Sequence, residues 1–144
     1  MANVVPNAFK GELLSGTHNF ASGRDSFKLA LYTANPYTTS STAYSSGAGN
    51  EVSGSAAGYS TGGSALTSQA VASSTTTASV DFANLTFSSA TFAAAFGAIY
   101  NDDKSDKLVV ILDFGGTKTA TNGDFTIAFP DPSTPANAII SLTS

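Results

Sequence analysis

One stretch of the sequence, residues 58–62, matches a catalytic motif. It reads Gly-Tyr-Ser-Thr-Gly and fits the G-x-S-x-G nucleophile elbow, in which a strand-to-helix turn exposes the serine beside a histidine base. The flanking residues are rich in serine and glycine, and the only histidine, His18, precedes the serine instead of following it. Chance matches are expected in such a composition, so we predict no catalytic residue and no enzymatic activity.

The other polar residues lack the spacing of metal or cofactor sites. His18 alone cannot build a three-histidine zinc site, and we interpret it as a structural histidine near the end of the first helix. The acidic stretch 101–106 lacks the pattern and the closing glutamate of a calcium loop, which favours a solvated hairpin turn. Residues 47–49 lack the third glycine of a dinucleotide fingerprint. We predict no metal and no cofactor, although paired glycosidase carboxylates depend on a spatial separation that sequence does not reveal.

The composition restricts the classes of partner. The 144 residues fit one domain, and 11% are charged, against roughly 25% in typical soluble domains. A net charge of −4 with six scattered basic residues argues against nucleic-acid binding. Residues 1–6 lack the features of a signal peptide, and no window reaches the roughly 18 apolar residues of a membrane span. We therefore expect synthesis in the cytoplasm and no membrane partner.

The stretch 92–114 predicts a central β-hairpin with a polar tip at 101–106. The returning arm, 107–114, is rich in β-branched and large apolar residues, which is typical of an inner strand. Because side chains alternate along a strand, one face should carry Leu108, Val110, Leu112 and Phe114, and the other Val109 and Ile111.

Six further segments predict short strands, at 26–33, 65–73, 77–82, 84–87, 124–129 and 136–143. Gly115 and Gly116 predict a turn after the hairpin, and residues 6–16 predict a short helix that Asn7 caps and Gly16 ends. The pattern indicates an all-β fold, an antiparallel, jelly-roll-like β-sandwich with a short N-terminal helix. We expect a single domain, 1–144, in which 1–20 can serve as a docking arm.

The best candidates for partner contact lie in the N-terminal segment and in the long irregular region 34–64. Tyrosines on adaptable loops are common in contact surfaces, and a loop this long is unusual unless it has a role. The alternative, that the rings only hold the loop against the sheet, stays open. The candidates are Val4, Val5, Phe9, Leu13, Tyr37, Tyr44 and Tyr59.

Several stretches together resemble small structural proteins of tailed bacteriophage particles: 9–16, 27–33, 50–54, 59, 62–63, 98–102, 110–115, 122–127 and 129–130. The resemblance implies a β-rich protein of the virion, such as a capsid decoration (cement) protein. We expect it on the capsid surface, bound to the major capsid protein and to its own copies, most simply as a trimer. The alternatives are a tail, neck or fibre-base component of the same particle and a carbohydrate-binding β-sandwich.

Overall fold

The structure is a computed structural model that describes residues 3–130 and 138–144. It confirms an all-β sandwich with a short N-terminal helix. Pro132, Pro135 and the predicted start of the last strand at 136 lie outside the described residues. In chain order the elements are α1 (Asn7–Leu14), β1 (Phe27–Tyr32), β2 (Ser64–Ala65), β3 (Ala70–Ser73), β4 (Thr77–Asp81), β5 (Leu85–Asn101), the 3-10 turn η1 (Asp102–Lys104), β6 (Lys107–Ile127) and β7 (Ile140–Thr143).

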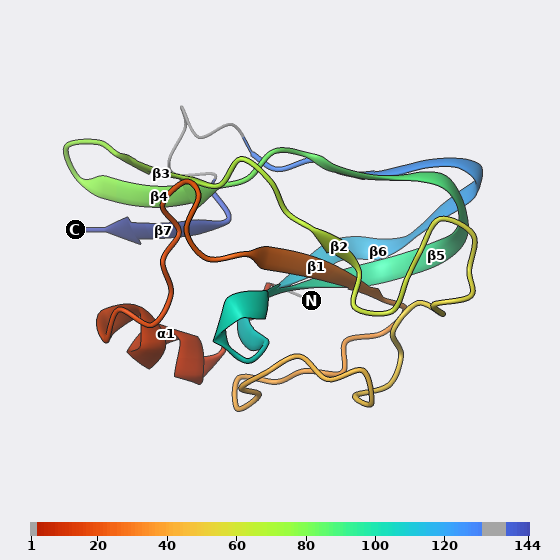
Figure 1. Ribbon diagram of the computed structural model, residues 1–144, viewed down its shortest axis with the longest axis horizontal. Helices are drawn as coiled ribbons and strands as arrows, with labels where there is room; N and C mark the ends of the chain where they lie inside the picture. Colours follow the sequence, from red (N-terminus) through yellow and green to blue (C-terminus); the bar gives the residue numbers. More distant parts are fainter. Residues whose placement is uncertain (1–2, 131–137) are drawn as a thin grey trace.

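Two antiparallel sheets form the layers. Sheet A has the strand order β2-β1-β5-β6, and sheet B has the order β3-β4-β7 (Figure 1). One cluster of buried side chains, the main core, joins the two sheets, because it contains Leu29 and Ile99 from sheet A and Val80 from sheet B. The sandwich therefore shares one apolar interior, which α1 extends through the buried ring of Phe9.

The predicted central hairpin is present, and it is much longer than the sequence indicated. The segments predicted separately at 84–87 and 124–129 are the outer ends of β5 and β6, which pair from Leu85 with Ile127 to Asn101 with Lys107. Figure 1 shows both strands turning over at one end of the molecule, so that their outer halves lie above their inner halves. One bent hairpin thus contributes to both sides of the main core.

The predicted turn at 115–116 is wrong, because β6 continues through both glycines. Ala94 pairs with Lys118 and the next pair is Phe96 with Asp113, so β6 carries several extra residues here. The two glycines have φ values of +70° and +129°, which residues with a Cβ rarely adopt. They form an irregularity that bends the strand without reversing it.

A second bulge, near the tip, changes which way the side chains of β6 face. Ile99 pairs with Val110 and Tyr100 pairs with Leu108, which leaves Val109 as an extra residue. Val109 therefore packs in the main core beside Val110, and Leu108 turns to the opposite side of the sheet. The prediction that Leu108 shares a face with Val110 was wrong because it assumed unbroken alternation.

The side chains of β1 alternate between the two faces of sheet A. Phe27, Leu29 and Leu31 belong to the main core. The opposite row, Ala30 and Tyr32, belongs to a second core on the other face of sheet A. The second core consists of Ala30, Tyr32, Tyr37, Ala98, Tyr100, Leu108 and Ile111.

The region 34–64 is irregular, as predicted, up to the start of β2. Within it Glu51 forms one bridge to Tyr32, and the strand predicted at 65–73 is divided into β2 and β3. A second bridge joins Ala43 to Lys107 at the start of β6. These contacts place the loop along the edges of sheet A.

The N-terminal helix differs from its prediction at its first residue. Pro6 occupies the N-cap position and no side chain caps the helix, whereas the side chain of Asn7 accepts a hydrogen bond from Lys10. Gly16 follows the helix with φ of +72°, as predicted. No helix among the described residues is long and apolar enough to cross a membrane.

Candidate functional site

The residues of the nucleophile-elbow match lie in the irregular loop, with neither a strand before them nor a helix after them. Ser60 is exposed there. The two ring nitrogens of His18 bond to Glu12 and Asn101, so this histidine does not serve Ser60 as a base. In the described part of the chain, no group of three metal-ligating side chains comes together.

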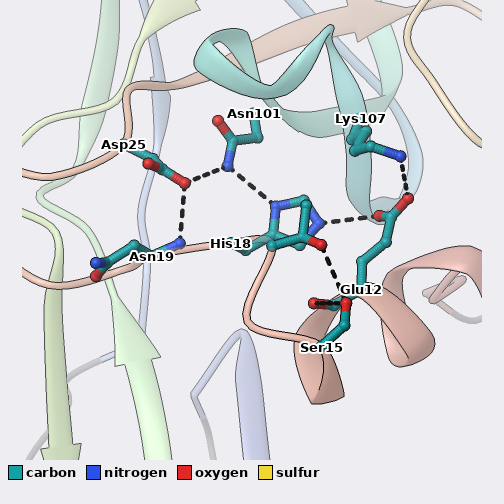
Figure 2. A network of polar contacts seen from close by, with 8 residues as sticks. Glu12, Ser15, His18, Asn19, Asp25, Asn101 and Lys107 are labelled. Atoms are coloured by element: carbon teal, nitrogen blue, oxygen red, sulfur yellow. Dashed lines mark hydrogen bonds and ion pairs between the residues drawn. The ribbon is translucent and has the colours of Figure 1, made fainter.

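His18 is the centre of a polar network, which we define as Glu12, His18, Asp25, Asn101 and Lys107 (Figure 2). Its two central residues, His18 and Asn101, are buried. The Nε2 atom of His18 lies 3.0 Å from Oε2 of Glu12, and its Nδ1 atom lies 3.0 Å from Nδ2 of Asn101. The same amide nitrogen donates to Oδ2 of Asp25 at 2.8 Å. Lys107 donates to the other carboxylate oxygen of Glu12.

The carboxylate of Asp25 determines the tautomer of His18. An ionised carboxylate only accepts hydrogen bonds, so the Asn101 amide must direct its NH₂ group toward Asp25. That same NH₂ group meets Nδ1 of His18, which must then act as an acceptor. The proton of the neutral ring therefore sits on Nε2 and is donated to Glu12.

The polar network holds α1 and the following loop to the tip of the central hairpin. Burial alone raises the pKa of Glu12, but the hydrogen bonds from Lys107 and His18 outweigh it and hold this pKa below its ordinary value. Burial also raises the pKa of Asp25, and the bonds from Asn101 and the Asn19 amide reverse that effect and lower it. Both carboxylates thus stay ionised and keep their partners, which is a structural role.

All five tyrosines of the chain gather around the carboxylate of Glu51. We call Glu51 with Tyr32, Tyr37, Tyr44, Tyr59 and Tyr100 the tyrosine cluster. Glu51 accepts hydrogen bonds from the hydroxyls of Tyr44 and Tyr59, at 3.0 and 2.8 Å, and from the amide of Gly62 at 2.7 Å.

The remaining members of the cluster connect the loop to sheet A. The hydroxyl of Tyr100 donates to the carbonyl of Gly62, and the ring of Tyr44 stacks on that of Tyr100 with centroids 4.5 Å apart. The hydroxyls of Tyr32 and Tyr37 lie 3.0 Å from each other. Every ring is therefore engaged inside the chain.

Four phenols of this cluster are held protonated. Burial raises the pKa of Tyr32, Tyr44, Tyr59 and Tyr100 above the ordinary phenol value. For Tyr44 the hydrogen bond to Glu51 raises the pKa further, because ionisation would place two negative charges together.

Apart from Tyr44, which is engaged by Tyr100 and Glu51, the candidate contact residues divide into two groups. Tyr37 and Tyr59 are 6% and 5% exposed, which matches the alternative that these rings hold the loop to the sheet. Phe9 is also buried, and the backbone of Val4 bonds to that of Ile111 at the edge of β6. These side chains have little surface to offer a partner in the isolated chain.

Val5 and Leu13 do line a surface, a groove between α1 and β7 with a volume of about 810 Å³. We call it the α1–β7 groove, and its lining residues are Val5, Phe9, Lys10, Leu13, Leu14, Ile139, Ile140, Ser141 and Leu142. Leu14 is 90% exposed and Leu142 is 59% exposed. Neither was predicted from the sequence. For Leu14 a signal was present, because Leu13 and Leu14 are adjacent on a two-turn helix and cannot both face one core.

Comparison of the chain with protein-family models, with curated proteins and with solved structures yields no match. The functional assignment therefore rests on the residues and geometry described above.

Proposed function

We propose that this chain is a structural, non-catalytic component of a tailed-phage particle, a decoration (cement) protein that binds the lattice of the major capsid protein. The observation that carries the proposal is the α1–β7 groove, an apolar surface on a chain with few charges. Exposed apolar area of this kind is typical of a protein interaction site. The resemblance of the chain to virion proteins supplies the class of partner.

The mechanism is stabilisation by mass action. A protein that binds only the assembled lattice lowers the free energy of that lattice and leaves its dissociated subunits unchanged. The bent hairpin and the loop held by the tyrosine cluster give a rigid body, so little conformational entropy is lost on binding. The site of action is the outer surface of the capsid, after synthesis in the cytoplasm of the host.

Cryo-electron microscopy of purified virions, combined with quantitative mass spectrometry, tests this proposal. We expect hundreds of copies on the shell, and capsids stripped of the protein should release their genome at a lower temperature than complete capsids. A few copies located only at the tail would overturn the decoration role and favour a tail, neck or fibre-base component. Unchanged thermal release would also count against the mechanism.

A further inference from the structure

The side-chain amide of Asn101 uses only one of its two polar ends. The residue is fully buried, and its NH₂ group contacts both His18 and Asp25. Its carbonyl oxygen, Oδ1, is also buried and has no hydrogen-bond partner among the described residues. A buried acceptor without a partner is costly, and native structures keep few of them. This oxygen is explained if the polar network has a second arrangement in which Oδ1 accepts a hydrogen bond.

Protonation of His18 supplies the missing donor. The neutral ring donates through Nε2 to Glu12 and accepts at Nδ1 from the NH₂ group of Asn101. A protonated ring donates from both nitrogens, so its Nδ1 atom can no longer face an NH₂ group. If the amide of Asn101 rotates by half a turn, Oδ1 faces Nδ1 and accepts a hydrogen bond from it. The NH₂ group then takes the former place of Oδ1.

The same rotation breaks the contact between Asn101 and Asp25. The Oδ2 atom of Asp25 lies 2.8 Å from the amide nitrogen, and after the rotation it would face the amide oxygen instead. Two acceptors repel each other, so the carboxylate must turn away. The backbone N–H of Asn19 donates to this same Oδ2 atom at 2.9 Å and would lose its acceptor. The segment 19–25 would thereby be released from the end of β5.

The charges around the ring assign the first proton to His18. The carboxylates of Glu12 and Asp25 face it from α1 and from the following loop, and each has a lysine partner, Lys107 from β6 and Lys104 from η1. Burial raises the pKa of both carboxyls, but their hydrogen bonds outweigh it and hold each pKa below its ordinary value. Both carboxylates therefore remain ionised where an imidazole titrates. Among the described residues, sheet B adds only uncharged side chains to the cavity of about 240 Å³ beside His18.

The helix α1 stays attached when the ring is protonated. Figure 2 shows His18 between Glu12 and Asn101, with Asp25 on the far side of the amide. The bond from a protonated ring to the ionised Glu12 has a charge on both partners, and such bonds are roughly twice as strong as neutral ones. Glu12 also keeps its bond to Lys107. Acid therefore strengthens the side of the network that holds α1 and breaks the side that holds the loop.

We infer that His18 and Asn101 form an acid-sensitive latch between the loop and the hairpin. With His18 neutral, the amide of Asn101 binds Asp25 and the latch is closed. With His18 protonated, the amide turns over to His18 and the latch is open. Opening frees the segment 19–25 from β5 while α1 stays docked through Glu12. The latch is independent of the proposed function and belongs to the purified chain.

Nuclear magnetic resonance of the purified protein between about pH 8 and pH 5 tests the latch, because His18 is the only histidine. The ring signals of His18 and the NH₂ signals of Asn101 should change with one common midpoint. After correction for the intrinsic effect of pH, the amide of Asn19 should exchange roughly tenfold faster in acid, as expected for the loss of one hydrogen bond to a charged group. The amides of α1 should not. Asn101 signals that ignore the titration of His18, or a ring that stays neutral until the protein unfolds, overturn the inference.

Two substitutions separate the latch from a general effect of acid. His18→Gln removes the titrating ring, and Asp25→Ala removes the acceptor that opening releases. In both variants the corrected exchange rate of the Asn19 amide should be the same at the two ends of the pH range. Asp102→Ala, which removes an ion pair of 3.0 Å with Lys28 at the same hairpin tip, is the matched control and should keep the wild-type response.

The response of Asp25→Ala is the sharpest outcome. If its Asn19 amide still exchanges faster in acid while the circular dichroism spectrum stays native, another group causes the change and the latch is excluded. If either variant fails to fold, the titration of the wild-type protein decides alone.

Discussion

Glu51 is the residue that organises the long loop. Its carboxylate accepts three hydrogen bonds from two separate parts of the loop, one from Tyr44 and two from Tyr59 and Gly62. The two tyrosines also contact sheet A, Tyr44 through the ring of Tyr100 and Tyr59 through the amide of Leu31. Hydrogen bonds to a charged acceptor are stronger than neutral ones, and their loss leaves partly buried donors without a partner. A loop without helix or strand is thereby held in one conformation.

Replacing this carboxylate by an amide should destabilise the protein. In Glu51→Gln one acceptor oxygen becomes an NH₂ group that cannot accept from a tyrosine hydroxyl. We expect the free energy of unfolding, measured with urea, to fall by about 1.5–3 kcal/mol. Asp124→Asn, the same chemical change at an exposed position, should cost almost nothing. Equal effects of the two substitutions would show that the bonds to Glu51 contribute no stability.

The raised tyrosine pKa values predict a loss of stability in alkali. The unfolded chain loses its phenolic protons near pH 10, whereas the folded chain retains those of Tyr32, Tyr44, Tyr59 and Tyr100 to higher pH. The folded state therefore binds more protons, and stability is complete below about pH 10 and falls as pH rises above it. Absorbance at the tyrosinate band measures the ionisation of the phenols directly, since the chain has no tryptophan or cysteine. Ionisation of all five tyrosines near pH 10 in the folded protein would contradict the prediction.

At the scale of elements, the irregularities in β6 decide the fold. The bulge at Val109 exchanges the faces of two side chains, and the glycines at 115–116 let the strand bend while it stays paired. The same sheet also determines how the loop closes, because Gly63 passes directly against the backbone of β1.

Two glycines with nearly equal φ values allow the energetic cost of backbone strain to be distinguished from the cost of steric overlap. Gly16 and Gly63 have φ values of +72° and +75°, but a Cβ on Gly16 would meet nothing within 4 Å, whereas one on Gly63 would lie 1.8 Å from the carbonyl oxygen of Leu29. We expect Gly16→Ala to cost about 1–2 kcal/mol from strain alone. Gly63→Ala should cost clearly more, because the loop must move away from β1. Equal losses of unfolding free energy would mean that the loop yields without cost.

At the scale of the whole molecule, one core serves both sheets. Leu29 in sheet A and Val80 in sheet B pack in the same cluster, and the bent hairpin lines it from two sides. A shared interior of this kind predicts that the chain unfolds as a single domain.

Core substitutions in either sheet should shift one common transition. Leu29→Ala should lower the free energy of unfolding by about 2–5 kcal/mol, and Val80→Ala by less because it removes fewer carbon atoms. Tyrosine fluorescence reports sheet A, where the tyrosine cluster lies, and amide exchange in β4 reports sheet B. Both probes should move together in each variant. Separate transitions would divide the protein into two folding units.

Local patterns in the sequence determined several features of this protein. The alternation in β1, the polar tip of the hairpin and the left-handed end of α1 follow from side-chain periodicity and from the conformational freedom of glycine. The interpretation of His18 as a structural residue also rested on the sequence alone, because one histidine cannot build a three-histidine zinc site.

Only the tertiary structure decided the bulges, the tyrosine cluster and the α1–β7 groove. A bulge is defined by the partner strand, so the facing of Leu108 and Val109 depends on β5 and not on β6 alone. Glu51 meets its tyrosines through loop closure, which no short-range pattern encodes. The exposure of Leu14 and Leu142 depends on how α1 and β7 pack against the rest of the chain. Short-range preferences act between neighbours in the chain, whereas pairing register and surface coverage arise from contacts between residues that are distant in sequence.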